Sequence, residues 1–285
     1  MRKLRKCGNA QFNTGITKCP PNFGKKRMAI IVPKGTKLPA NLTADALEEL
    51  AHSANNTRIY GVFDFVEYAK NGGEVQTSAN GYGPEEITGI SALKETFTLR
   101  KYAPELHASF VRAGNREWGA YFIDEDNILY GENDGTDTLA PIDMSCIYTD
   151  VTPSPTSSAA ATMSVTFAYA DVKKAYSNYD YVPLGFNAQN LVLGLMNVRL
   201  EKVGETGNNY KMFEVVGGYD VTDIYGPLIA TAGSTVVNGT TTAVTYDEAT
   251  DTLTVAAGSG NTPISLKSPS VLYDNGIKGI EQVTA

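Results

Sequence analysis

The sequence predicts a mainly β protein: a β-sandwich with two short helices, followed by a smaller β-sandwich. Charged residues make up only 19% of the chain, whereas glycine, threonine and tyrosine are abundant, and this balance favours strands and turns over helices. Apolar residues recur with period two in several segments, as half-buried strands require. A chain of 285 residues is long enough for one large β domain or two ordinary domains.

Three parts are expected along the chain. Residues 1–27 form an irregular basic arm, because Pro20 and Pro21 exclude regular structure ahead of the first apolar run at residues 28–32. Residues 28–185 form the first β-sandwich domain, with a long Pro-, Ser- and Ala-rich loop at residues 149–162. Residues 186–285 hold six or more candidate strands, a spacing typical of a small β-sandwich.

Two helices are predicted, both in the first half of the chain. Thr43 is a suitable cap for the first, and Leu47, Leu50, Ala51 and Ala54 recur at helical spacing on one face. The second begins at Pro104, whose fixed backbone angle fits a first helical turn, and ends at Gly114.

Strand signals dominate the rest of the first domain. Residues 162–169 alternate apolar with small or hydroxylated side chains, and residues 95–100 alternate in the same way. Residues 118–123 and 128–130 flank an acidic turn at residues 124–127, which indicates a hairpin. The strand at residues 144–148 is expected to pair with the strand that follows the long loop.

In the second domain, hairpins are expected around residues 207–209, around Asn238 and Gly239, and around residues 247–251. The last is the clearest, because Val244 and Tyr246 before the turn mirror Leu253 and Val255 after it.

The residues needed for common enzymatic mechanisms do not form a recognisable motif. The chain has two histidines, His52 and His107, and both fall on predicted helices, where packing is the simpler role. Three cysteines, Cys7, Cys19 and Cys146, are too few and too far apart for a disulfide scaffold or a four-ligand zinc site. The sequence therefore predicts a protein that is not an enzyme and holds no cofactor.

The charge distribution is strongly uneven. Residues 1–44 contain ten Lys or Arg and no acid, whereas the remainder carries fourteen basic and thirty-one acidic side chains. A basic arm on an acidic body suits an acidic patch on a neighbouring copy, and nucleic acid is the alternative partner. The residues assigned to this assembly arm are Arg2, Lys3, Arg5, Lys6, Lys25, Lys26 and Arg27.

Acidic side chains also cluster near the predicted hairpin at residues 124–127. Asp124, Asp126, Asp134 and Asp137 are candidate oxygen ligands for calcium or magnesium. Their spacing matches no EF-hand loop, and Asp and Asn in turns usually hydrogen-bond their own backbone. The sequence therefore predicts no metal site and leaves these four as the candidates.

Several segments carry a resemblance to a known family. They are FVEYAKNGG at residues 65–73, Gly83, ITGISA at 87–92, TFTL at 96–99, YGENDGTD at 130–137 and MSVTF at 163–167. Over residues 7–182 the chain resembles structural proteins of tailed bacteriophages, particularly crAss-like gut phages, and it is similar to the tail-tube class. The C-terminal hundred residues resemble the immunoglobulin-like decoration domains often appended to such proteins.

This resemblance implies a non-enzymatic structural component of a bacteriophage virion, assembled in the cytoplasm of the bacterial host. It implies a tail tube or tail-barrel ring subunit in a closed ring of sixfold or twelvefold symmetry. Genomic DNA would pass through the lumen without specific binding. The expected partners are further copies of this chain and other tail or portal-proximal proteins, with no membrane, because no run of about 18 apolar residues occurs.

Two alternative functions are compatible with the same sequence. A head decoration or head-fibre protein would also suit a C-terminal β-sandwich. A carbohydrate-binding or adhesin module would need an exposed row of tyrosines, for which Tyr176, Tyr179 and Tyr181 are the candidates.

Overall fold

The computed structural model describes residues 23–39, 41–54, 56–79, 81–114, 116–150, 154–156, 160–204, 208–238, 241–257 and 264–283. The chain divides into two compact units. Unit 1 comprises Met1–Ala44 and Ile59–Val192, and unit 2 comprises Asp45–Arg58 and Leu193–Ala285. Strands outnumber helices in the described residues of both units, so the predicted mainly β class is confirmed.

Eleven of the described strands in unit 1 form one curled antiparallel sheet. Its main path runs β2-β10-β9-β8-β11-β12-β7-β4, with β1 on β8, β3 on β1 and β13 on β9. The elements of this unit are β1 (Lys26–Pro33), β2 (Leu38–Pro39), β3 (Tyr60–Val62), β4 (Phe65–Asn71), β5 (Val75–Ala79), β6 (Glu85–Ile90), β7 (Lys94–Leu99), α2 (Pro104–Ala113), β8 (Trp118–Asp124), β9 (Ile128–Asn133), β10 (Thr138–Ala140), β11 (Ile142–Thr149), β12 (Met163–Tyr169), α3 (Val172–Ser177), β13 (Tyr179–Pro183) and the 3-10 turn η1 (Ala188–Asn190).

Strand β8 is the branch point of this sheet. One edge of β8 pairs with β1 along its whole length, from Lys26 opposite Asp124 to Pro33 opposite Trp118. The other edge pairs first with β11 and then with β9. Every residue of β8 is buried, because strands or side chains cover it on all sides.

The core of unit 1 is built from the alternating residues that the sequence singled out. Met163, Val165, Phe167 and Tyr169 of β12 are all buried, so the predicted half-buried strand is confirmed. Phe167 packs its ring edge-on against Phe97 and Phe122. Burial of a Phe side chain contributes about 1.5–3 kcal/mol.

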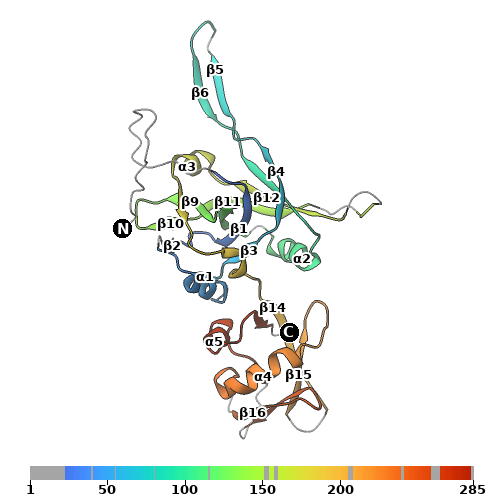
Figure 1. The fold of residues 1–285 in the computed structure, drawn as a ribbon. Helices are drawn as coiled ribbons and strands as arrows, with labels where there is room; N and C mark the ends of the chain where they lie inside the picture. The colour runs from blue at the N-terminus through green and yellow to red at the C-terminus, as the bar shows by residue number, and fades with distance from the viewer. Residues whose placement is uncertain are drawn as a thin grey trace. The chain divides into compact units, whose positions relative to one another are not determined.

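A long hairpin runs outward from the same sheet. β4 pairs with β7, and beyond them β5 pairs only with β6 as a separate two-stranded ribbon that projects from the rest of unit 1 (Figure 1). Gly72 permits the bend between β4 and β5, since its φ is +79° and a Cβ there would lie 1.8 Å from the Ala92 carbonyl oxygen. All five residues of β5 and the first four of β6 are exposed.

Unit 2 has one five-stranded sheet in its described residues, in the order β16-β17-β15-β14-β18. Its elements are α1 (Ala44–Ala51), β14 (Met196–Lys202), β15 (Asn209–Glu214), α4 (Thr222–Ala232), the 3-10 turn η2 (Gly233–Thr235), β16 (Thr241–Asp247), β17 (Thr252–Ala257), α5 (Pro269–Asp274) and β18 (Ile280–Gln282). β14 and β18 are parallel, and the other pairs are antiparallel.

A helix takes the place that a second sheet has in an immunoglobulin-like sandwich. α4 packs against β15, β16 and β17 and buries Ile229 in the same cluster as Val244, Leu253 and Val255. The sequence predicts no helix at α4, because Gly226 and Pro227 are unfavourable within helices. Gly226 is required here by close packing, since a Cβ would lie 2.5 Å from the Tyr246 ring.

Several local predictions can be compared with these elements. The helices beginning near residue 44 and at Pro104 are confirmed, as are the hairpins β8–β9, β14–β15 and β16–β17 and the pairing of β11 with β12 across the long loop. Val244 lies opposite Val255, and Tyr246 lies opposite Leu253, as predicted. The hairpin expected around Asn238 is wrong, because η2 precedes it and Val237 bridges to Leu266 instead.

Residues 45–58 pack within unit 2 although they precede most of unit 1 in the sequence. The Arg58 guanidinium makes two hydrogen bonds to the Glu281 carboxylate, at 2.6 and 3.0 Å. Glu48 accepts hydrogen bonds from Lys278 and Tyr273, and these donors hold the pKa of its carboxyl below the usual value. These contacts fasten α1 and the segment after it to the C-terminal strand and its preceding helix.

A single ion pair ties β1 to β7 in unit 1. Lys26 Nζ lies 2.6 Å from Glu95 Oε2, and both side chains are largely buried. Glu95 also accepts hydrogen bonds from the hydroxyls of Tyr68, at 2.9 Å, and Tyr169, at 2.8 Å. Lys26 Nζ lies 4.1 Å from the centre of the Phe122 ring, so the ammonium has an aromatic face as a further partner.

Replacing Glu95 with Ala is expected to lower the free energy of unfolding of unit 1 by about 3–5 kcal/mol, because Lys26 is left as a buried charge without its acceptor. Urea denaturation followed by the fluorescence of Trp118, the single tryptophan, measures this loss. Glu117→Ala is the control, since the Glu117–Lys34 pair is exposed and is expected to contribute less than about 1 kcal/mol. Equal stability of the two variants would contradict this account.

Arg58→Ala is expected to destabilise unit 2 by about 3 kcal/mol, because it leaves the Glu281 carboxylate without its bidentate partner. Hydrogen exchange of the β18 amides, measured by mass spectrometry, should then become faster. Arg199→Ala removes an exposed pair with Glu201 in the same unit and is the matched control. Unchanged β18 protection in Arg58→Ala would refute the role given to residues 45–58.

Candidate assembly interface

The predicted basic arm is only partly within the described residues. Arg2, Lys3, Arg5 and Lys6 lie outside them. Lys26 and Arg27 belong to β1, so the irregular arm predicted for residues 1–27 ends before them. Glu95 holds Lys26 inside unit 1. The charge pattern did not indicate this pairing, because a count of charges along the sequence does not show which residues lie close together in the folded sheet.

The two remaining basic residues lie at the surface beside Lys26. Arg27 pairs with Glu125 across an exposed contact of 3.3 Å. The Lys25 backbone N–H donates to the same carboxylate at 3.2 Å. Within the described part of the chain, the Lys25 ammonium has no carboxylate within ion-pair distance.

A cavity of about 650 Å³ opens between the beginning of β1 and the beginning of β4. Gly24–Arg27 line one side, and Phe65–Tyr68 line the other, with Glu95 also in the lining. We name this gap the wedge. β3 pairs with β1 only at Ala29–Ile31. The residues of β1 before Ala29, which line the wedge, therefore have no partner in β3.

The wedge has a polar centre with apolar sides. Burial lowers the pKa of Lys26, and the nearby Glu95 carboxylate opposes that shift. Burial and the same carboxylate raise the pKa of the Tyr68 and Tyr169 hydroxyls. Lys26, Tyr68 and Tyr169 all donate to the Glu95 carboxylate. This network of three donors and one acceptor is suited to structural support at neutral pH.

β4 presents an open edge beside this cavity. It ends the main strand path of the sheet, and its residues after Phe65 are exposed. Val66 and Tyr68 are about half exposed, and the register between β4 and β7 shifts between Phe65 and Glu67. An exposed strand edge with apolar side chains is a typical site for another strand or chain to bind.

The second exposed feature is the outer hairpin, which we define as β5, β6 and the turn residues Gly81–Pro84 between them. Val75 and Ile87 are 57% and 75% exposed, and Tyr82 in the turn is fully exposed. Glu85 and Glu86 follow the turn directly, and no Lys or Arg occurs between residues 71 and 93. The outer hairpin is thus acidic and carries apolar side chains in solvent.

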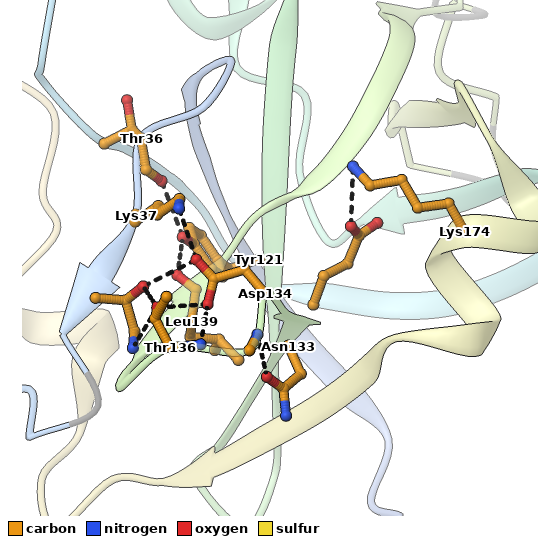
Figure 2. Close-up of polar contacts among 11 residues, drawn as sticks. Thr36, Lys37, Tyr121, Asn133, Asp134, Thr136, Leu139 and Lys174 are labelled. Atoms are coloured by element: carbon orange, nitrogen blue, oxygen red, sulfur yellow. Dashed lines mark hydrogen bonds and ion pairs between the residues drawn. The ribbon is translucent and has the colours of Figure 1, made fainter. Parts of the chain in front are cut away.

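The turn between β9 and β10 uses one of the metal candidates, Asp134 (Figure 2). Asp134 accepts hydrogen bonds from the Thr136 backbone and hydroxyl and from the Thr138 hydroxyl, and it pairs with Lys37 at 2.6 Å. The buried Tyr121 hydroxyl donates to the Thr36 and Leu139 carbonyl oxygens behind this turn. These contacts fasten the turn to the segment before β2.

Asp124 has a comparable role at the other hairpin. It is buried and accepts hydrogen bonds from the backbone of Asp126 and Ile128 and from the Tyr130 hydroxyl. No group of three or more His, Cys, Asp or Glu side chains able to hold a metal ion occurs within the described residues, so Asp124, Asp126, Asp134 and Asp137 are not brought together there. Lys174, on α3, pairs with Glu132 on the far side of the same region (Figure 2).

The three tyrosines considered for sugar binding do not form an exposed row. Tyr176 is half exposed, whereas Tyr179 is partly buried and stacks on Tyr130 with ring centres 5.7 Å apart. Tyr181 is also partly buried, in β13. The arrangement that the adhesin alternative requires is therefore not found at these residues.

No protein-family model and no curated protein matches the chain. Among solved structures, one similar chain is described as "Cryo-EM structure of the anti-feeding prophage cap (AFP tube terminating cap)". The likeness covers 60% of this chain and 98% of that one, at 10% identity and a TM-score of 0.29. A TM-score this low does not establish a common fold, and the likeness assigns no role to this chain.

The sequence pattern of β7 indicates that Glu95 is buried. Glu95 shares its strand face with Phe97 and Leu99, which are both buried, so the alternation places its carboxylate toward the core. A buried acid in such a register requires a cationic or hydrogen-bonding partner. Tyr82 and the outer hairpin had no comparable signal, because exposure depends on the tertiary structure.

Asp134→Asn is expected to make the stability of unit 1 less sensitive to acid. Lys37 and Thr136 hold the pKa of Asp134 below its usual value, so its stabilising contribution is complete above about pH 4, the pKa of an unfolded Asp, and is lost as the pH falls further. Urea midpoints measured at pH 7 and pH 3 test this. The Lys37→Met variant should also have a midpoint that depends less on pH than that of the wild type. If the urea midpoints of both variants depended on pH as strongly as that of the wild type, the stabilising role given to the Asp134 carboxylate would be contradicted.

Proposed function

We propose that the protein is a non-enzymatic structural subunit of a tailed-bacteriophage virion that assembles with further copies of itself into a closed ring or tube of the tail. The phage assignment rests on the sequence segments described above. The observation that carries the assembly role is the presence, on one unit, of an uncovered outer hairpin and an open sheet edge beside a cavity.

The exposed ribbon supports self-assembly on energetic grounds. An isolated two-stranded hairpin is only marginally stable in water. Because Val75, Ile87 and Tyr82 are exposed, their apolar area contributes no burial free energy to the hairpin. A ring of identical subunits removes such edges and apolar side chains from water. In this proposal the basic residues ahead of Gly24 act as an assembly arm that reaches a neighbouring subunit, whereas Lys26 and Arg27 belong to β1 of their own unit.

The charge distribution supports a passage for DNA. Residues 45–285 carry thirty-one acids against fourteen bases, so their surface repels a polyanion. A lumen lined by this surface would let DNA slide without binding. No helix among the described residues is both long and apolar enough to cross a membrane.

A head decoration or head-fibre protein is the second candidate, and symmetry distinguishes the two. A tail ring is expected to be sixfold or twelvefold, whereas a decoration protein is more often trimeric or monomeric.

Light scattering of the full-length chain over a concentration series, followed by negative-stain imaging, is expected to show rings or tubes. Replacement of residues 74–91 by Asn-Gly, a two-residue hairpin turn, should abolish these assemblies and leave the Trp118 urea transition in place. Trimers in the wild type would favour the decoration role. A wild type that remains monomeric up to its solubility limit would contradict the proposal.

A further inference from the structure

We infer that the tip of the outer hairpin of one copy docks in the wedge of the next copy, with Tyr82 as the inserted side chain. This inference rests on the proposed function and names the two surfaces that form the repeating contact. Both surfaces belong to unit 1 and consist of described residues.

Tyr82 is shaped for insertion. It lies in the turn with glycine on both sides, at Gly81 and Gly83, so no neighbouring side chain shields the ring. A buried tyrosine contributes a large apolar area together with one hydroxyl that needs a partner. Fully exposed, it contributes none of this to the stability of its own subunit.

The wedge offers the complementary environment. Its volume of about 650 Å³ is within the range of sites that enclose drug-sized ligands, and so it has room for an aromatic ring. Phe65, Val66 and Tyr68 supply apolar and aromatic lining, and the polar network on Glu95 supplies a hydroxyl-compatible centre. The open edge of β4 adds backbone groups that an incoming strand can pair with.

The charges on the two surfaces also favour contact between the hairpin tip and the wedge. Lys26 and Arg27 are already paired with Glu95 and Glu125. Lys25 lines the wedge, and its ammonium has no carboxylate within ion-pair distance in the described residues, although Glu125 interacts with it electrostatically from further away. Glu85 and Glu86 come directly after the turn that carries Tyr82. Insertion of the tip therefore brings two carboxylates toward the Lys25 ammonium.

The reach of the hairpin fits a contact between copies. Fifteen residues separate Glu67 in the wedge from Tyr82 at the tip, which corresponds to about 45–50 Å of extended strand. A compact unit of this size has a diameter of about 40 Å. The hairpin can thus reach at most about one unit diameter from the wedge of its own chain.

Such a contact is heterologous, because a hairpin on one copy meets a wedge on another. Repetition of a heterologous contact produces a closed ring when the rotation per subunit divides a full turn, and an open helical filament otherwise. The inferred contact therefore gives an assembly of more than two copies, as the proposed ring requires.

Charge reversal tests the pairing directly. Lys25→Glu alone, and Glu85→Lys with Glu86→Lys, should each raise the concentration needed for assembly by about tenfold or more, as loss of a central interface contact does. The triple variant should recover most of the wild-type assembly, because the charges are again opposite. Lys173→Glu, an equal charge change on exposed α3 of the same unit, is the control.

The inserted ring is tested by Tyr82→Ser, with Tyr219→Ser, an exposed tyrosine of unit 2, as the matched control. Only Tyr82→Ser should weaken assembly. Wild-type assembly in Tyr82→Ser, or no recovery in the triple variant, would overturn the inference while leaving the proposed ring intact. Failure of the wild type to assemble would instead remove the proposed function and the inference with it.

Discussion

The Lys26–Glu95 ion pair is the interaction on which the form of unit 1 depends. It joins β1, which pairs with β8 and β3 off the main strand path, to β7, the neighbour of the terminal strand β4. Two tyrosine hydroxyls and the Phe122 ring compensate for the burial of these charges. The pair therefore keeps β1 and β4 at a fixed separation, and the wedge is the space that remains between them.

Unit 2 depends on a different constraint: it is built from two segments of the chain that are far apart in the sequence. Residues 45–58 supply α1 and Arg58 to a unit whose other residues begin at Leu193. Arg58 and Glu48 then hold Glu281 and Lys278, more than two hundred residues away. Because such long-range contacts join distant segments, the fold of unit 2 requires residues that precede most of unit 1.

Features set by local chemistry were predictable from the sequence, and features set by distant contacts were not. The acidic turn at residues 124–127 predicts the β8–β9 hairpin, and Val244 and Tyr246 mirror their partners across β16–β17 because period-two alternation fixes register. α4 was missed since its Gly226 and Pro227 are tolerated only through packing on Tyr246 and the sheet. Lys26 was assigned to the irregular arm because no residue close to it in the sequence indicates that it pairs with Glu95.

Electron cryomicroscopy of the assembled full-length protein shows directly whether one copy inserts its outer hairpin into the next copy. We expect a ring or tube in which density for Tyr82 fills the wedge of the adjacent copy, next to Lys25 and Tyr68. An assembly whose wedges are empty, with the outer hairpins in solvent or packed elsewhere, would contradict it.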